Sequence, residues 1–161
     1  MSSPAARASH TETVSAPFST VLAALVEKVY KPELHVPAVI SSRIVADAGG
    51  RGVERHMHNT VKSVDPELGD IHELITWEES SHADGRRKVC FTFTTLTDLM
   101  FEGTVTNTAE ELDASSTRVT YELQWNFKAD VSQEARVAPF GGNCAALMRG
   151  AVLKMKATCE A

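Results

Sequence analysis

The sequence predicts an α+β fold in which one curved antiparallel β-sheet wraps around a long C-terminal helix. Apolar and polar side chains alternate in several segments between residues 40 and 129, which is typical of half-buried strands in a meander. Helical periodicity replaces this alternation near both ends of the chain. A meander with one apolar face needs a cover, and only a helix is left to provide it.

The N-terminal part is expected to hold a leader, one strand and one helix. Residues 1–8 are interpreted as a disordered leader, and the polar, Thr-rich segment 8–16 is a candidate edge strand. A helix is predicted between Pro17, which suits a helix start, and Pro32, which limits its end. Its apolar stripe consists of Val21, Leu22, Leu25, Val26 and Val29.

Six further strands are predicted in the central part of the chain, at residues 40–50, 52–61, 70–80, 87–96, 101–112 and 117–129. The last of them has the clearest alternation, with one apolar face that holds Val119, Tyr121, Leu123, Trp125 and Phe127. From about residue 132 to 159 the chain is predicted to be helical, with a break at the PFGG segment. Because no linker, repeat or low-complexity tract interrupts this order, residues 1–161 are expected to form a single domain.

The composition limits the classes of function. The chain has 161 residues, 43% hydrophobic and 23% charged, which fits one globular domain that needs neither a metal nor a disulfide for stability. A net charge of -5 without any basic run argues against nucleic-acid binding. The longest apolar runs are too short for a membrane span. Three cysteines without CxxC spacing indicate reduced thiols and a cytoplasmic protein.

Two charged residues fall in the middle of apolar strand faces. Side chains on a strand alternate, so Arg55 shares the inward face of Val53 and Met57. The same rule places Glu73 inward beside Ile75, unless a β-bulge turns one of the charges outward. A loop connects the two strands, so they are expected to be neighbours, and an ion pair would lower the cost of burying each charge.

Three interpretations of this pair stay open: a structural ion pair, a polar anchor for a ligand, or acid/base chemistry. As an anchor, it would orient a small, largely apolar molecule that contacts Trp77, Phe91, Phe93, Tyr121, Trp125 and Met148. As chemistry, Glu73 would be the general base and Arg55 would stabilise an enolate, in a cyclase or dehydratase acting on a carbonyl-bearing natural product. An arginine partner stabilises the charged carboxylate and weakens it as a base, which favours binding. For a ligand anchor beside a wet cavity, we expect single replacements of either residue to cost little stability.

No motif indicates a cofactor or a metal. The sequence lacks GxSxG, P-loop and GxGxxG motifs, so no cofactor is expected. His56 and His58 share the outer face of their strand with Glu54. Since no further ligand is placed by spacing, we expect no metal site.

Two stretches carry a resemblance to a known superfamily: APFSTVLAALVEKVYKPELHVPAVISSRIV, and RGVERHMHNTV followed by IHELITWEE. With their element order, the KPE after the first helix and the Arg55 and Glu73 positions, they resemble the START-like (SRPBCC, helix-grip) superfamily, which includes polyketide aromatase/cyclases. The chain looks most similar to the small AtaL-like family, some of whose members are associated with secondary metabolism. The resemblance implies a seven-stranded sheet gripping the C-terminal helix, with a hydrophobic cavity between them. An interaction domain that forms a homodimer through a sheet edge is a third hypothesis, to which no residue points.

Overall fold

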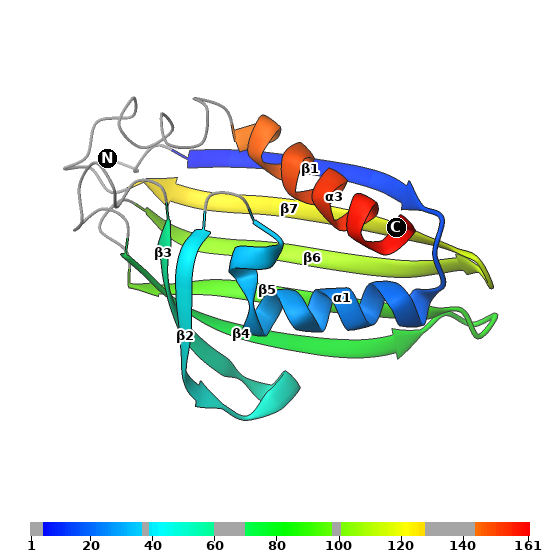
Figure 1. Cartoon of the computed structure of the whole chain (residues 1–161), viewed down its shortest axis with the longest axis horizontal. Coiled ribbons are helices and arrows are strands. Elements are labelled where there is room, and N and C mark those ends of the chain that lie inside the picture. Colours follow the sequence, from blue (N-terminus) through cyan, green and yellow to red (C-terminus); the bar gives the residue numbers. More distant parts are fainter. Residues whose placement is uncertain (1–4, 37–38, 60–69, 98–100, 128–143) are drawn as a thin grey trace.

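The alternating segments pair into a single antiparallel sheet of seven strands, ordered β1-β7-β6-β5-β4-β3-β2 (Figure 1). The computed structural model describes residues 5–36, 39–59, 70–97, 101–127 and 144–161. The strands are β1 (Ala5–Val14), β2 (Val39–Asp47), β3 (Val53–Asn59), β4 (Asp70–Ser81), β5 (Arg87–Thr97), β6 (Phe101–Asp113) and β7 (Ser116–Phe127). From β2 to β7 each strand pairs with the next in the sequence, which is the predicted meander.

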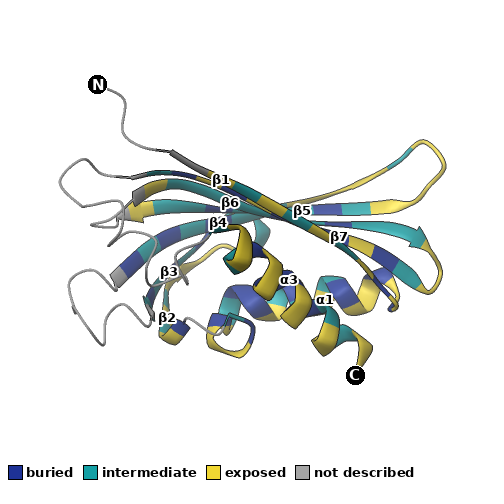
Figure 2. Ribbon diagram, turned by 90° about the horizontal axis from the view of Figure 1, so that it is seen from above, coloured by how far each residue is buried: buried dark blue, intermediate teal, exposed yellow. Residues whose placement is uncertain are grey.

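Two α-helices cover the same face of the sheet (Figures 1 and 2). Helix α1 (Phe18–Tyr30) begins directly after Pro17 and ends before Pro32, as predicted. Helix α3 (Cys144–Glu160) runs along β1 and β7. Short 3-10 turns, η1 (Pro32–Leu34) and η2 (Gly49–Arg51), follow α1 and join β2 to β3. The structure therefore confirms the predicted α+β fold, a sheet that grips a C-terminal helix.

The first strand begins earlier than the sequence indicates. Ala5 already pairs with Asn126, so β1 includes residues 5–8 of the segment interpreted as a disordered leader. The physical reason is that β7 offers a full edge of backbone hydrogen-bonding groups, which a polar segment can satisfy without an apolar pattern. The remaining leader residues, 1–4, lie outside the described residues, as do the helical part predicted over 132–143 and the PFGG break within it.

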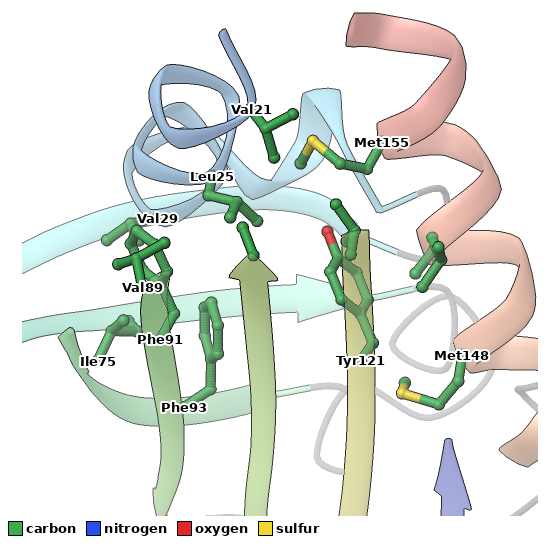
Figure 3. Close-up of a cluster of buried hydrophobic side chains, with 14 of the residues drawn as sticks. Val21, Leu25, Val29, Ile75, Val89, Phe91, Phe93, Tyr121, Met148 and Met155 are labelled. Carbon is green, nitrogen blue, oxygen red and sulfur yellow. The ribbon is translucent and has the colours of Figure 1, made fainter. Parts of the chain in front are cut away.

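The predicted inward faces form the core. In β7, Val119, Tyr121, Leu123 and Trp125 are buried, while the side chain of Phe127 lies outside the described residues. Figure 3 shows aromatic side chains rising from the sheet toward α1 and α3, whose own apolar side chains meet them. Burial of these alternating positions removes apolar surface from water and holds the helices on this face.

One glycine permits an unusually close approach between β6 and β7. Gly103 adopts φ +136°, and a Cβ atom there would lie 2.1 Å from the backbone oxygen of Gln124. Only glycine fits without moving the backbone, because it lacks a Cβ and tolerates a positive φ. Gly103 is paired with Trp125, which lines the site described below.

Candidate functional site

A cavity of about 110 Å³ lies between the sheet and the two helices. Its walls are mostly apolar side chains from the inward faces of the strands and from α3, and α1 contributes Lys28. Six of the eight residues that the sequence indicated for a site line it: Arg55, Glu73, Phe93, Tyr121, Trp125 and Met148. They come from five strands or helices that are distant in the sequence.

The other two predicted residues, Trp77 and Phe91, are not among the lining residues. They are paired across β4 and β5, and their rings stack with centroids 5.2 Å apart. Phe91 is fully buried in the core, and Trp77 is covered by η2, where a Cβ on Gly50 would lie 3.1 Å from the Trp77 backbone oxygen. Strand alternation predicts which face of the sheet a side chain occupies, but not which part of that face borders the cavity. Trp77 and Phe91 lie on the part that does not border it.

Arg55 and Glu73 form a buried ion pair, as their inward positions predicted. They are directly opposite each other on β3 and β4. The Nε and Nη2 groups of Arg55 donate to Glu73 Oε1 at 2.9 and 2.6 Å. Arg55 and Glu73 are 2% and 7% exposed, so neither faces bulk water. The expectation of a well-hydrated pair, and with it of small stability losses on single replacement, is therefore revised.

Arg55 also binds the end of α1. Its Nη1 group donates to the backbone oxygens of Lys28 and Val29, at 2.8 and 2.7 Å. These carbonyls belong to the last helical turn, where they have no partner within the helix and the helix dipole favours a cation. Four of the five N–H donors of the guanidinium are thus used by Glu73 and α1.

Glu73 has fewer of its hydrogen-bonding atoms occupied than Arg55 has. Both bonds from Arg55 end on Oε1, and Oε2 has no hydrogen bond to any of the described residues. The side chain of Glu73 is 10% exposed, against 3% for Arg55. An ionised carboxylate accepts through both oxygens, so Oε2 is an open acceptor at a cavity that Glu73 lines.

Lys28 is a cavity residue that the sequence analysis missed. It lies on α1, is 5% exposed, and donates from Nζ to Asn107 Oδ1 at 2.5 Å. The same Nζ lies 4.2 Å from the ring centroid of Tyr121 and 4.8 Å from that of Phe93. Burial, and after it repulsion from the Arg55 cation, lower the pKa of Lys28 to about 7, although Glu73 opposes the shift. A signal existed, because Lys28 follows Val21 and Leu25 by seven and three residues on the apolar stripe of the helix.

Two further buried polar groups surround this amine. Asn107 is fully buried on β6, and its Nδ2 has no hydrogen-bond partner among the residues that the structure describes. The hydroxyl of Tyr121 is also buried and finds no partner in the described part of the chain, and burial raises its pKa well above the usual range. An unsatisfied buried polar group costs about 1–3 kcal/mol, so two of them next to a buried lysine indicate a region under functional constraint.

His56 and His58 of β3 lie on the other face of the sheet, away from the cavity. A third histidine, His72, is on the neighbouring strand β4. The rings of His56 and His72 stack, with centroids 4.2 Å apart. Among the described residues, no three histidine, cysteine or acidic side chains are grouped closely enough to hold a metal ion. Within the same residues, no helix has the length and apolar character needed to cross a membrane.

Comparisons with known proteins find similar folds but no similar sequences. No protein-family model matches the sequence, and no curated protein matches it. Solved structures do match. The Zhui aromatase/cyclase from Streptomyces sp. R1128 has a TM-score of 0.61 and 17% identity, over 95% of this chain and 94% of that one. A START superfamily protein from Mycobacterium smegmatis has a TM-score of 0.57 and 14% identity, over 89% and 92% of the two chains.

Human STARD10 gives a TM-score of 0.65 at 13% identity, over 95% of this chain, which spans 62% of the STARD10 chain. At these identities the likeness establishes a START-like helix-grip fold. It leaves membership of the AtaL-like family as a prediction, and it assigns no ligand, because one fold carries many functions.

Proposed function

We propose that this protein binds a small, largely apolar molecule in the cavity and orients it through Glu73. The observation that carries the proposal is that Glu73 lines a mostly apolar cavity and that its Oε2 has no hydrogen bond to the described residues. Arg55 holds the carboxylate in place from the opposite strand. Binding sites for small molecules typically combine apolar walls with a few placed polar groups, and a carboxylate oxygen selects a ligand with a hydroxyl or N–H donor.

The size of the cavity restricts the ligand. A dry protein cavity of ~150 Å³ holds a benzene molecule, whereas pockets for drug-sized ligands measure roughly 300–1,000 Å³. The 110 Å³ cavity is smaller than both, so it encloses at most one ring or a short branched chain. This argues for a ring-sized ligand, or one ring of a larger one, rather than a whole lipid.

The comparisons are compatible with such a role. One neighbour is described as an aromatase/cyclase and another, human StarD13, as a lipid transfer and protein localization domain, so the fold serves both catalysis and carriage. The resemblance to the AtaL-like family supports a role in secondary metabolism, and the three cysteines without CxxC spacing support a cytoplasmic location. A homodimer stays a prediction; the outer strands available to it are β1 and β2.

The second candidate function is a cyclase or dehydratase with Glu73 as base. Oε2 suits a base, since it has no hydrogen bond to the described residues and can accept a proton. The proposed partner role of Arg55 is less well supported. Its bonds to Glu73 and to the α1 carbonyls leave one N–H for a developing oxyanion, so the geometry favours binding.

The test compares two ring-sized probes, phenol with a donor and toluene without one. By NMR titration, the wild type should bind both, and Glu73→Gln should weaken phenol binding about tenfold or more, as expected for a lost bond to a charged acceptor. In this variant Arg55 takes the amide oxygen, so the amide N–H₂ faces the ligand and toluene binding stays unchanged. Glu79→Gln is the matched control, because Glu79 is an exposed carboxylate on the same strand.

Failure of both probes to bind the wild type would contradict the proposal. Equal losses for phenol and toluene in Glu73→Gln would instead indicate that Glu73 only supports the shape of the cavity.

A further inference from the structure

The amine of Lys28 is placed as a reactive group would be. It lines the cavity between the rings of Phe93 and Tyr121, at 4.8 and 4.2 Å from their centroids. Its hydrogen bond goes to the neutral amide of Asn107, and among the described residues Lys28 has no salt bridge to a carboxylate. A lysine with a purely structural role is usually exposed or ion-paired.

The surroundings disfavour the protonated form of this amine. Burial removes the ammonium from water, and the Arg55 cation repels it. The other titratable groups near Lys28 are Glu73, which favours the ammonium, and Tyr121, which is neutral at ordinary pH. With a pKa of about 7, about half of the Lys28 amines are neutral at pH 7, whereas an ordinary lysine is neutral in roughly one molecule in a thousand.

We propose that Lys28 captures small aldehydes or ketones as a reversible imine. The inference rests on the proposed ligand cavity and adds the chemical class of the ligand: a ring-sized carbonyl compound. The amine lone pair forms a bond to the carbonyl carbon, and the carbonyl oxygen leaves as water together with both amine hydrogens. The C=N bond replaces the C=O bond without any oxidant or reductant, which is the chemistry of amines activated in apolar pockets.

The geometry supports each part of this step. A neutral amine that donates one hydrogen to Asn107 keeps its lone pair for the carbonyl carbon. The rings of Phe93 and Tyr121, which Figure 3 shows, lie beside Nζ and supply flat apolar walls against which a ligand ring can pack. Apolar walls also exclude the water that would hydrolyse the imine.

Reductive trapping tests the proposal on the full chain. The protein is incubated with benzaldehyde and sodium cyanoborohydride at pH 7, and the benzylated lysines are located by peptide mass mapping over time. Lys28 should be labelled at least about tenfold faster than exposed lysines, which are almost fully protonated at this pH. Excess toluene should slow the labelling of Lys28 alone, because it occupies the same cavity.

Two variants and one condition act as controls. Lys28→Met should lose the fast label, while Lys31→Met, which removes an exposed lysine three residues away, should keep it. In urea the Lys28 rate should fall to that of the other lysines. Mapping of the wild type needs no variant, so the test holds even if Lys28→Met folds poorly.

Slow labelling of Lys28 in a protein that binds toluene overturns the imine proposal and leaves the ligand cavity intact. Slow labelling without toluene binding overturns both. Fast labelling that persists in urea or ignores toluene also overturns it, because the reactivity would then not come from the cavity.

Discussion

Lys28 shows how burial changes a single side chain. Its stem lies on the apolar stripe of α1, and its amine is held by Asn107 and two aromatic rings instead of water. Taking an ammonium out of water costs far more than these contacts return, so the group responds by lowering its pKa. The protein keeps a residue that weakens the folded state at neutral pH, which is common where function requires it.

This residue should make stability depend on pH in a defined direction. Between the folded pKa of about 7 and the unfolded value of 10.5, the unfolded state binds the Lys28 proton and the folded state does not. Stability therefore rises with pH across this window, and the full cost applies below it. Relative to Lys28→Met, the wild type should gain about 2 kcal/mol of unfolding free energy from pH 7 to pH 9.

Urea unfolding of the wild type and of Lys28→Met at a series of pH values measures the difference in their unfolding free energies. The contributions of all other titrating groups are the same in both proteins and cancel in this difference. The exposed neighbour supplies the control, since Lys31→Met should show no such slope. A flat difference for Lys28→Met would mean that the amine stays protonated in the folded state.

Arg55 acts at the level of elements because it joins three of them. From β3 it bonds across the sheet to Glu73 on β4 and upward to the last turn of α1. These bonds fix the end of α1, and so Lys28, over the strands that line the cavity. Removal of the guanidinium leaves a buried carboxylate and two helix carbonyls without their donors.

Arg55→Met should therefore lower the free energy of unfolding by about 3–5 kcal/mol, the usual cost of breaking a buried ion pair. The double variant Arg55→Met with Glu73→Leu should recover part of this loss, because no buried charge remains unpaired. Recovery should stay incomplete, since the α1 carbonyls still lack Arg55. Urea unfolding of the wild type, both single variants and the double variant measures the loss and the recovery of unfolding free energy.

Arg86→Met gives the comparison for an exposed pair. Arg86 pairs with Asp84 in a turn, with both side chains about half exposed, and its loss should cost less than about 1 kcal/mol. Similar costs for Arg55→Met and Arg86→Met would show that the inner pair is as well hydrated as the outer one.

At the scale of the whole molecule, both helices lie on one face of the sheet (Figure 2), and the cavity is lined by side chains from that face and from α1 and α3. One small side chain on α3, that of Ala151, helps to keep it open. Ala151 is buried and lines the cavity, while Ala157 lies one to two turns further along α3 and is exposed. The same substitution at these two positions separates an effect on the cavity from an effect on the helix.

Ala151→Leu should fill part of the 110 Å³ cavity and weaken toluene binding about tenfold or more, measured by NMR titration. Circular dichroism should show the fold retained, since added volume in a core typically costs only about 1–3 kcal/mol. Ala157→Leu should leave binding unchanged. Unaltered toluene affinity in Ala151→Leu would place the ligand outside this cavity.

The sequence by itself determined the order of the elements and the inward face of each central strand, including the inward positions of Arg55 and Glu73. These features follow from local periodicity, because alternation along a strand depends only on the backbone of that strand. The start of β1 was harder to place, since its edge pairing with β7 leaves little apolar pattern to detect.

Only the tertiary structure decided which inward residues meet at the cavity. It separated Phe93, which lines the cavity, from Phe91 two residues earlier, and it brought Lys28 from α1 to Asn107 on β6. It also showed that Arg55, which was predicted to orient a ligand, donates hydrogen bonds to the backbone of α1. These outcomes depend on distances between elements far apart in the chain, and periodicity within one segment contains no information about such distances.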